Sequence, residues 1–178
     1  ADESLSGNVR AKLRIAELTA ASDPSYIPNI EALRCAQPPD LGAAEISVRL
    51  GATWIPADDV REFVLHLLDP PYWVREQVAV RYSAATAQWR IEGKGRDGSN
   101  ALSTYGTRRM SAYHIIEETL NLKDARVVDY VEDENGKKKP VLNKKETAVA
   151  LAKQEAIKAA FKEWVFSDQA RRERLVAA

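Results

Sequence analysis

The sequence predicts an α+β fold with two antiparallel β-hairpins and a long C-terminal helix. Apolar residues recur at helical spacing near both ends of the chain. In the centre the period becomes two, with Val78 and Val80 followed by Trp89 and Ile91. Further on, the turn signal Asn135-Gly136 stands between two apolar runs. These three observations favour helices packed on a small sheet.

Composition defines the class of protein. The chain has 178 residues, of which 45% are hydrophobic, and its 26 Lys and Arg balance its 26 Asp and Glu. A single Cys excludes a disulfide framework and a Cys-based zinc site, and it fits a reducing compartment. No apolar run approaches the roughly 18 residues of a membrane span, and no signal-peptide pattern opens the sequence. We therefore expect a globular cytoplasmic protein.

The neutral charge is the sum of two unlike parts. Residues 1–136 hold 15 basic and 21 acidic side chains, whereas residues 137–178 hold 11 basic and 5 acidic ones. The basic part either contacts nucleic acid or forms a solvated helix face.

The first third of the sequence predicts helices separated by prolines. One helix is expected from Val9, after the N-cap candidates Ser6-Gly7-Asn8, and a short one over residues 29–36. Residues 46–50 alternate like a short strand. Pro56-Ala57-Asp58-Asp59 then starts a helix, because proline suits the first turn and acids favour the positive end of the helix dipole.

The alternating centre predicts a first hairpin about Ala84-Ala85. This turn places Val80 opposite Trp89 and Val78 opposite Ile91 on the buried face. Arginines occupy the other face. A flexible glycine-rich loop and a helix over residues 111–122 are expected to follow.

The Asn135-Gly136 turn predicts a second hairpin, which we expect to share one sheet with the first. Its register pairs Glu134, Asp133 and Glu132 with Lys137, Lys138 and Lys139 respectively. The lysine run would then face its own counter-ions rather than a nucleic acid. Pro140 lacks an N–H and indicates an edge strand.

The long helix is expected to begin after Asn143, which acts as N-cap, with Glu146 at the third helical position. Its predicted apolar face carries Val149, Ala152, Ala156, Ala160, Phe161, Trp164 and Val165, with Lys153, Lys158 and Lys162 on the other face. Ser167-Asp168 then caps a last helix.

These elements predict a single α+β domain over residues 1–168. It comprises a helical part (1–70), a hairpin and helix part (71–142) and the long helix (143–166). Residues 169–178 form a separate terminal helix.

Asp69-Pro70-Pro71-Tyr72 matches the active-site tetrapeptide of adenine-specific DNA methyltransferases, in which the acid holds the exocyclic amine and the tyrosine stacks on the flipped base. Asp69 and Tyr72 are therefore the candidate catalytic residues of an alternative enzyme hypothesis. However, the preceding apolar residues follow a helical period, and no glycine-rich turn upstream suits S-adenosylmethionine. We therefore interpret this tetrapeptide as the end of a helix, and we expect no catalytic residue in the chain.

Other chemistries lack their motifs. The sequence contains no Walker loop, no Gly-x-Ser-x-Gly elbow and no cluster of metal ligands around His66 or His114, so we expect no metal site. Cys35 is expected to be a small buried hydrophobe.

Nucleic-acid contact remains as a hypothesis. The basic residues around the first hairpin could follow a phosphate backbone, or they could pair with the acid-rich segment 117–134. The candidate contacts, with the lysines of the long helix, are Arg75, Arg81, Arg90, Lys94, Arg96, Arg108, Arg109, Lys153, Lys158 and Lys162.

Four stretches of the sequence resemble one region of very large bacterial proteins carried by phages, plasmids and integrative elements. They are Leu5-Ser6-Gly7-Asn8-Val9-Arg10-Ala11-Lys12-Leu13, Val48-Arg49-Leu50-Gly51-Ala52-Thr53-Trp54-Ile55-Pro56, Tyr105-Gly106-Thr107, and Asn143-Lys144-Lys145-Glu146-Thr147 with the helix through Trp164. Those proteins join an adenine-specific DNA methyltransferase to a Swi/Snf-type DEAD/DEAH helicase, and some are linked to anti-restriction.

The resemblance implies a non-catalytic connector, excised from between the methyltransferase part and the helicase core, which assists DNA engagement or couples the flanking parts. Residues 169–178 would lead into the helicase core. S-adenosylmethionine and ATP would bind elsewhere in the parent, and the partners would be DNA and the flanking domains. A purely protein-binding spacer is the remaining alternative.

Overall fold

The computed structural model describes residues 9–20, 23, 25, 27–36, 46, 48–95, 98–134 and 136–176. The chain divides into two compact units, residues 1–42 and 43–178. This division lies inside the stretch for which the sequence predicted one domain, and the terminal helix belongs to the second unit. Within the described ranges, no helix is long and apolar enough to cross a membrane.

The first unit contains two helices, α1 (Val9–Ala20) and α2 (Ile27–Cys35), close to the predicted positions. An ion pair of 2.8 Å joins Arg34 Nη2 to Glu17 Oε1 across the two helices. Cys35, expected to be buried, is exposed, because it ends α2 on the side away from Leu33. The N-cap candidates at residues 6–8 lie outside the described residues.

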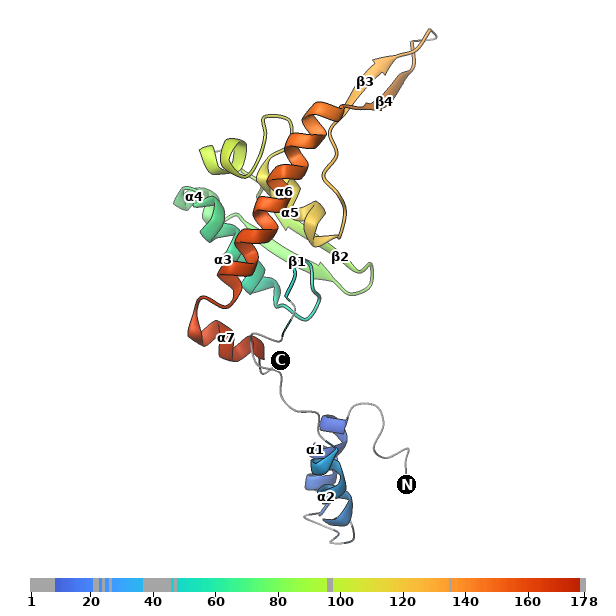
Figure 1. The fold of residues 1–178 in the computed structure, drawn as a ribbon, viewed down its shortest axis with the longest axis vertical. Coiled ribbons are helices and arrows are strands. Elements are labelled where there is room, and N and C mark those ends of the chain that lie inside the picture. The colour runs from blue at the N-terminus through green and yellow to red at the C-terminus, as the bar shows by residue number, and fades with distance from the viewer. Residues whose placement is uncertain are drawn as a thin grey trace. The chain divides into compact units, whose positions relative to one another are not determined.

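The second unit confirms the α+β class (Figure 1). Its elements are α3 (Ala57–Leu68), α4 (Tyr72–Arg75), β1 (Ala79–Ser83), β2 (Gln88–Glu92), the π-helix η3 (Asn100–Thr104), α5 (Ala112–Leu120), β3 (Val128–Glu132), β4 (Lys138–Leu142), α6 (Lys144–Val165) and α7 (Gln169–Val176). Residues 48–50 form no strand, although Val48 and Leu50 are buried.

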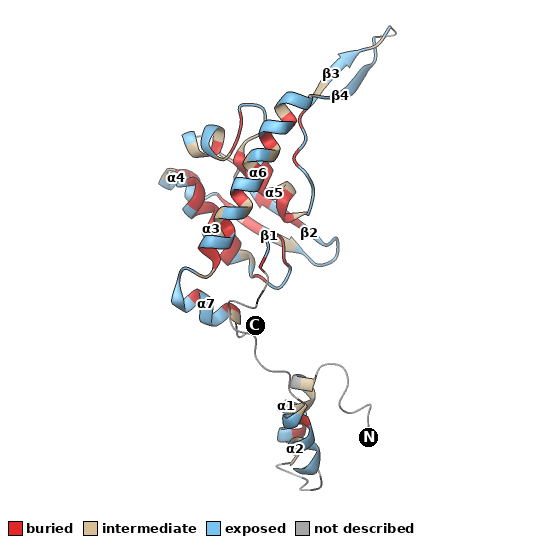
Figure 2. Ribbon diagram, in the orientation of Figure 1, coloured by how far each residue is buried: buried red, intermediate tan, exposed pale blue. Residues whose placement is uncertain are grey.

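The core lies where α3, α5 and α6 meet the inner face of the β1–β2 hairpin (Figure 2). Its centre is aromatic: the rings of Phe63 and Phe161 meet edge to face at 5.0 Å, and Trp164 lies 5.4 Å from Phe63. Such pairs contribute about 0.5–1.5 kcal/mol beyond their burial. They hold α6 against α3.

The first hairpin has the predicted faces but not the predicted register. Val80 lies opposite Ile91, two residues from the expected pairing, because the connection has four residues and ends at Ala87 with φ +51°. A shift of two keeps every side chain on its face. Val80 and Ile91 are accordingly buried, and the arginines Arg81 and Arg90 are exposed.

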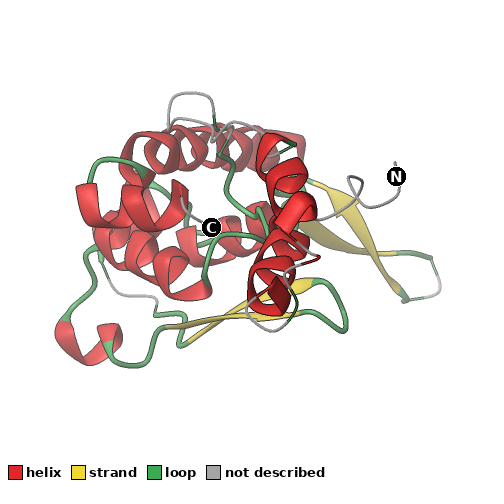
Figure 3. Ribbon diagram, turned by 90° about the horizontal axis from the view of Figure 1, so that it is seen from below, coloured by secondary structure: helices red, strands yellow, loops and turns green. Residues whose placement is uncertain are grey.

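The second hairpin forms a sheet of its own, so the expectation of one shared sheet is wrong (Figure 3). Its register also differs by one residue: Glu132 lies opposite Lys138 rather than Lys139. The reason is a longer loop, in which Asp133 N–H donates to Lys137 O at 3.0 Å and Gly136 adopts φ +72°. A shift of one exchanges the faces of the second strand.

The long helix begins as predicted, with the Asn143 side chain accepting from Glu146 N–H at 3.0 Å. Its buried face differs from the predicted one: Val149 is 43% exposed, whereas Gln154 is 1% exposed. The reason is that a polar side chain can occupy a buried position when its hydrogen bonds are satisfied. The buried row is Thr147, Ala150, Gln154, Ile157, Phe161, Trp164 and Val165.

Gln154 and Thr147 attach the connection between α5 and β3 to α6. The Gln154 carboxamide accepts from Ala125 N–H at 3.2 Å and donates to Lys123 O at 2.8 Å and to Thr119 Oγ1 at 3.0 Å. Two turns earlier on the helix, Thr147 Oγ1 accepts from Val127 N–H at 3.0 Å.

The predicted cap of the last helix is confirmed, since Asp168 Oδ1 accepts from Arg171 N–H at 2.8 Å. The Arg171 guanidinium lies 3.5 Å from the ring centroid of Trp164 and donates to Trp164 O, which closes the C-terminal end of α6. Arg174 pairs with the buried carboxylate of Asp59 in the first turn of α3. These contacts hold α7 against α3 and α6.

We expect Gln154→Leu to lower the free energy of unfolding by about 3 kcal/mol, because it removes three hydrogen bonds and leaves the buried Ala125 N–H without its acceptor. Urea denaturation measures the change. Gln169→Leu, on an exposed helix position, is the matched control and should change stability by less than about 0.5 kcal/mol. Equal losses in the two variants would contradict the structural role of the buried amide.

Candidate nucleic-acid interface

Most of the predicted contact residues already hold partners within the chain. Ion pairs join Arg75 to Asp69 at 3.1 Å, Arg81 to Glu92 at 3.3 Å, Arg109 to Asp129 at 2.7 Å, Lys94 to Glu117 at 2.8 Å and Lys158 to Glu155 at 2.8 Å, and Lys153 Nζ donates to Thr104 O at 2.9 Å. Arg96 lies outside the described residues.

Lys94 is the most firmly held of these cations. Its partner Glu117 also accepts from Ile91 N–H at 2.7 Å, which ties α5 to β2. Burial raises the pKa of Glu117, but the Ile91 N–H and the Lys94 ammonium outweigh burial and hold the pKa below its usual value. Lys94 is therefore a structural residue.

Arg81 and Arg90 face each other on the exposed side of the first hairpin. Like charges directly opposite repel. Arg81 is held by Glu92, whereas Arg90 has no side-chain partner among the described residues. Arg108, on the loop before α5, is likewise exposed.

A cationic groove forms between α6 and the C-terminal end of α5. Lys158 and Lys162 project from successive turns of α6, and Arg49 and Lys123 reach the groove from two loops. Asp124 and Glu155 are the acids in the lining, and the groove has a volume of about 440 Å³. Lys153 lies on the other flank of α6, against η3. The structure thus brings together only two of the predicted lysines.

Two unusual backbone conformations shape the groove. Gly51 has φ +97°, and a Cβ there would lie 2.5 Å from Leu120 O, so only glycine lets the Arg49 loop approach α5. At the end of α5, Leu122 has φ +58°, and Lys123 N–H donates to Glu118 O at 2.8 Å, as in a Schellman motif. This turn aims Lys123 into the groove.

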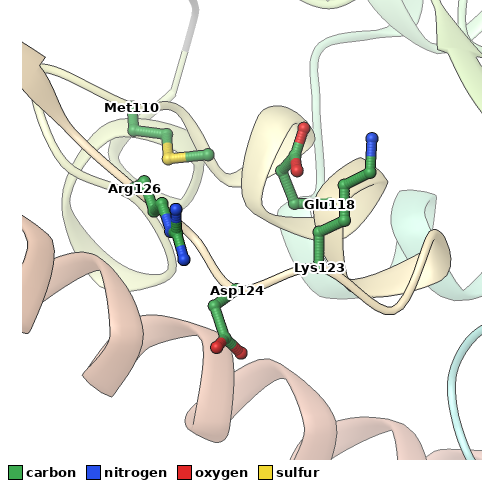
Figure 4. Close-up of a pocket in the computed structure, with 5 residues that line it drawn as sticks. All are labelled: Met110, Glu118, Lys123, Asp124 and Arg126. Atoms are coloured by element: carbon green, nitrogen blue, oxygen red, sulfur yellow. The ribbon is translucent and has the colours of Figure 1, made fainter. Parts of the chain in front are cut away.

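A second hollow of about 420 Å³ shares Lys123 and Asp124 with the groove. Figure 4 shows Met110 and Arg126 on one side and Glu118 and Lys123, at the end of α5, on the other. Arg126 adds a fifth cation beside the connection between α5 and β3. Sequence reasoning missed Arg49, Lys123 and Arg126, because each is an isolated cation on a loop.

The Asp69-Pro70-Pro71-Tyr72 motif follows a helix, as the apolar period predicted. Asp69 ends α3 with φ +40° and donates its N–H to Leu65 O. Its carboxylate pairs with Arg75, and Tyr72 is 73% exposed, edge to face with Trp73. The described residues include no group of three or more potential metal ligands.

A model of one protein family, described as Domain of unknown function (DUF8437), matches residues 49–178 of the chain. The search of curated proteins found no match. The search of solved structures found none either.

Glu117→Gln should lower the unfolding free energy at neutral pH by about 1 kcal/mol, because a neutral amide cannot pair with Lys94 as a carboxylate does. The depressed pKa of Glu117 gives the folded state stability that is present above the carboxylate's unfolded pKa and lost as pH falls through the folded value. Wild type should therefore lose more stability than the variant between about pH 6 and pH 3.5.

Denaturant unfolding at a series of pH values measures this difference. Glu163→Gln, which removes an exposed carboxylate from α6, is the control and should keep the pH dependence of wild type. A Glu117→Gln variant with the pH dependence of wild type would rule out the stabilising role of the Glu117 carboxylate.

Proposed function

The chain belongs to the DUF8437 family, whose model covers most of its length. We propose that its second unit is a non-catalytic accessory domain that contacts the phosphate backbone of DNA. The observation that carries the proposal is the groove between α6 and the end of α5, where Arg49, Lys123, Lys158 and Lys162 converge. Cations brought together from three separate segments of the chain produce a local positive field that the neutral net charge conceals.

The charges of the groove favour an anionic ligand. Four cations stand against two acids, and the Lys158–Glu155 pair of 2.8 Å cancels one of each, which leaves three cations against Asp124. Asp124, the other acid, lies next to Lys123 and lines the adjoining hollow together with Arg126. The C-terminal end of α5 carries a partial negative charge from the helix dipole. This partial charge attracts the lysines of the groove but is too small to neutralise them.

The shape of the groove favours a polymer over a small anion. The groove and the hollow beside it share Lys123 and Asp124, so lining cations continue from the groove to Arg126 in the hollow, where Glu118 is the added acid. A row of cations suits a phosphate backbone, which is contacted at successive phosphates and without sequence preference. The resemblance to methyltransferase–helicase proteins supports DNA as that polymer, with the domain coupling the flanking parts.

We expect Lys158→Glu together with Lys162→Glu to weaken DNA binding at least tenfold, because two attractive charges become repulsive. Fluorescence anisotropy with single-stranded and duplex oligonucleotides at two salt concentrations measures the affinity. Binding by wild type should weaken as salt rises, and the variant should show a salt slope smaller by about 1–2.

The matched control is Lys144→Glu together with Lys145→Glu, which makes the same charge change at the start of α6, away from the groove. This control should retain most of the affinity. If both double variants lose affinity equally, or if wild-type binding ignores salt, the groove is not a DNA-contact site.

A further inference from the structure

The β3–β4 hairpin is an arm joined to the rest of the second unit at its root, where Arg109 pairs with Asp129 and donates to Val128 O. It extends past the first turn of α6, and Figure 2 shows it exposed along its length. Nine of its ten strand residues are exposed, including Tyr130 at 68% and Val131 at 53%. Two strands alone are marginally stable in water, and a third strand would supply further ladder hydrogen bonds.

Two backbone hydrogen bonds across the arm show which of its backbone groups point outward. Asp133 N–H donates to Lys137 O at 3.0 Å, and Asn143 N–H donates to Val127 O at 2.9 Å. In an antiparallel pair, residues alternate between facing the partner strand and facing away. The odd-numbered residues therefore bond across the arm. The outward groups belong to Val128, Tyr130 and Glu132 on β3 and to Lys138, Pro140 and Leu142 on β4.

The two outer edges of the arm are unlike. On β4 the central outward position is Pro140, which has no N–H to donate, and Lys138 is next to it. Those are the two residue types that discourage strand addition at an edge. On β3 the central outward position is Tyr130, with an N–H and a C=O available. At the root of the arm, Arg109 Nη2 donates to Val128 O at 3.1 Å and to Asp129 Oδ1 at 2.7 Å.

We propose that the outer edge of β3 pairs antiparallel with β3 of a second copy of this chain, about a two-fold axis at Tyr130. An axis there places Val128 opposite Glu132 of the second copy and Asp129 opposite Val131, so no like charges meet. An axis at residue 129 places Asp129 opposite its own copy. An axis at residue 131 places Asp129 opposite Asp133. Of these three registers, only the one with its axis at Tyr130 keeps carboxylates from lying opposite each other.

The resulting sheet has the strand order β4, β3, β3, β4, and both of its edges carry Pro140. Association therefore ends at the dimer, as closed two-fold symmetry requires. Each copy contributes only the five residues of β3 to the interface, which is therefore small. We expect a dissociation constant of about 0.1–1 mM. The β3 edge is separate from the cationic groove, so this proposal does not rest on the proposed DNA contact.

Sedimentation equilibrium of the 178-residue chain, from about 10 µM to about 1 mM, tests the proposal. Wild type should pass from monomer to dimer across this range. Tyr130→Pro removes one outward N–H but no bond between β3 and β4, so it should weaken dimerisation at least tenfold with an unchanged melting temperature. A wild-type chain that stays monomeric at the highest concentration would overturn the proposal.

Two further variants separate the strand edge from the tyrosine ring. Tyr130→Thr keeps the outward N–H and should still form the dimer. Pro140→Val gives β4 an outward N–H and should produce species larger than a dimer at high concentration. Loss of dimerisation in Tyr130→Thr as complete as in Tyr130→Pro would show that the ring, and not the edge, makes the contact.

Discussion

The buried side chain of Gln154 is the interaction on which the arrangement of the second unit depends. One amide binds Ala125, Lys123 and Thr119, and so fixes the whole connection between α5 and β3 along one flank of α6. The walls of the cationic groove and the starting point of the arm both follow from that attachment. The Asn143 side chain completes it, because it caps α6 and also donates to Asp129 Oδ2 at 2.8 Å in β3.

The charges of the protein are organised by pairing at short range. Cations that look available in the sequence, such as Lys94 and Arg109, are bound to carboxylates contributed by distant elements. Arg49, Lys123 and Lys162, by contrast, gather where two loops approach α6. Their collective field therefore depends on Gly51 and on the turn after α5, rather than on any basic run in the sequence.

The sequence predicted the elements better than their relations. Apolar spacing and capping residues located α3, α5 and α6, since these signals are local. The hairpin registers were missed because each depends on loop length, and Ala87 at positive φ gives no signal. The buried face of α6 was missed because glutamine usually lies at the surface. The groups that satisfy the Gln154 amide lie about 30 positions away in the sequence. The groove was missed for the same reason, because Arg49 and Lys123 become neighbours of Lys158 only through folding.

The pairing of Asp59 with Arg174 has a consequence for the chain during its synthesis. The two residues are separated by 115 positions, so the ribosome completes the arginine on the order of ten seconds after the aspartate. Through that interval the carboxylate has no counter-ion, and burying it alone would be strongly unfavourable. The first turn of α3 must stay hydrated, and Phe63 must wait for Phe161 and Trp164. A nascent chain therefore leaves the part of α3 that contacts α6 uncovered until almost the whole second unit has been made.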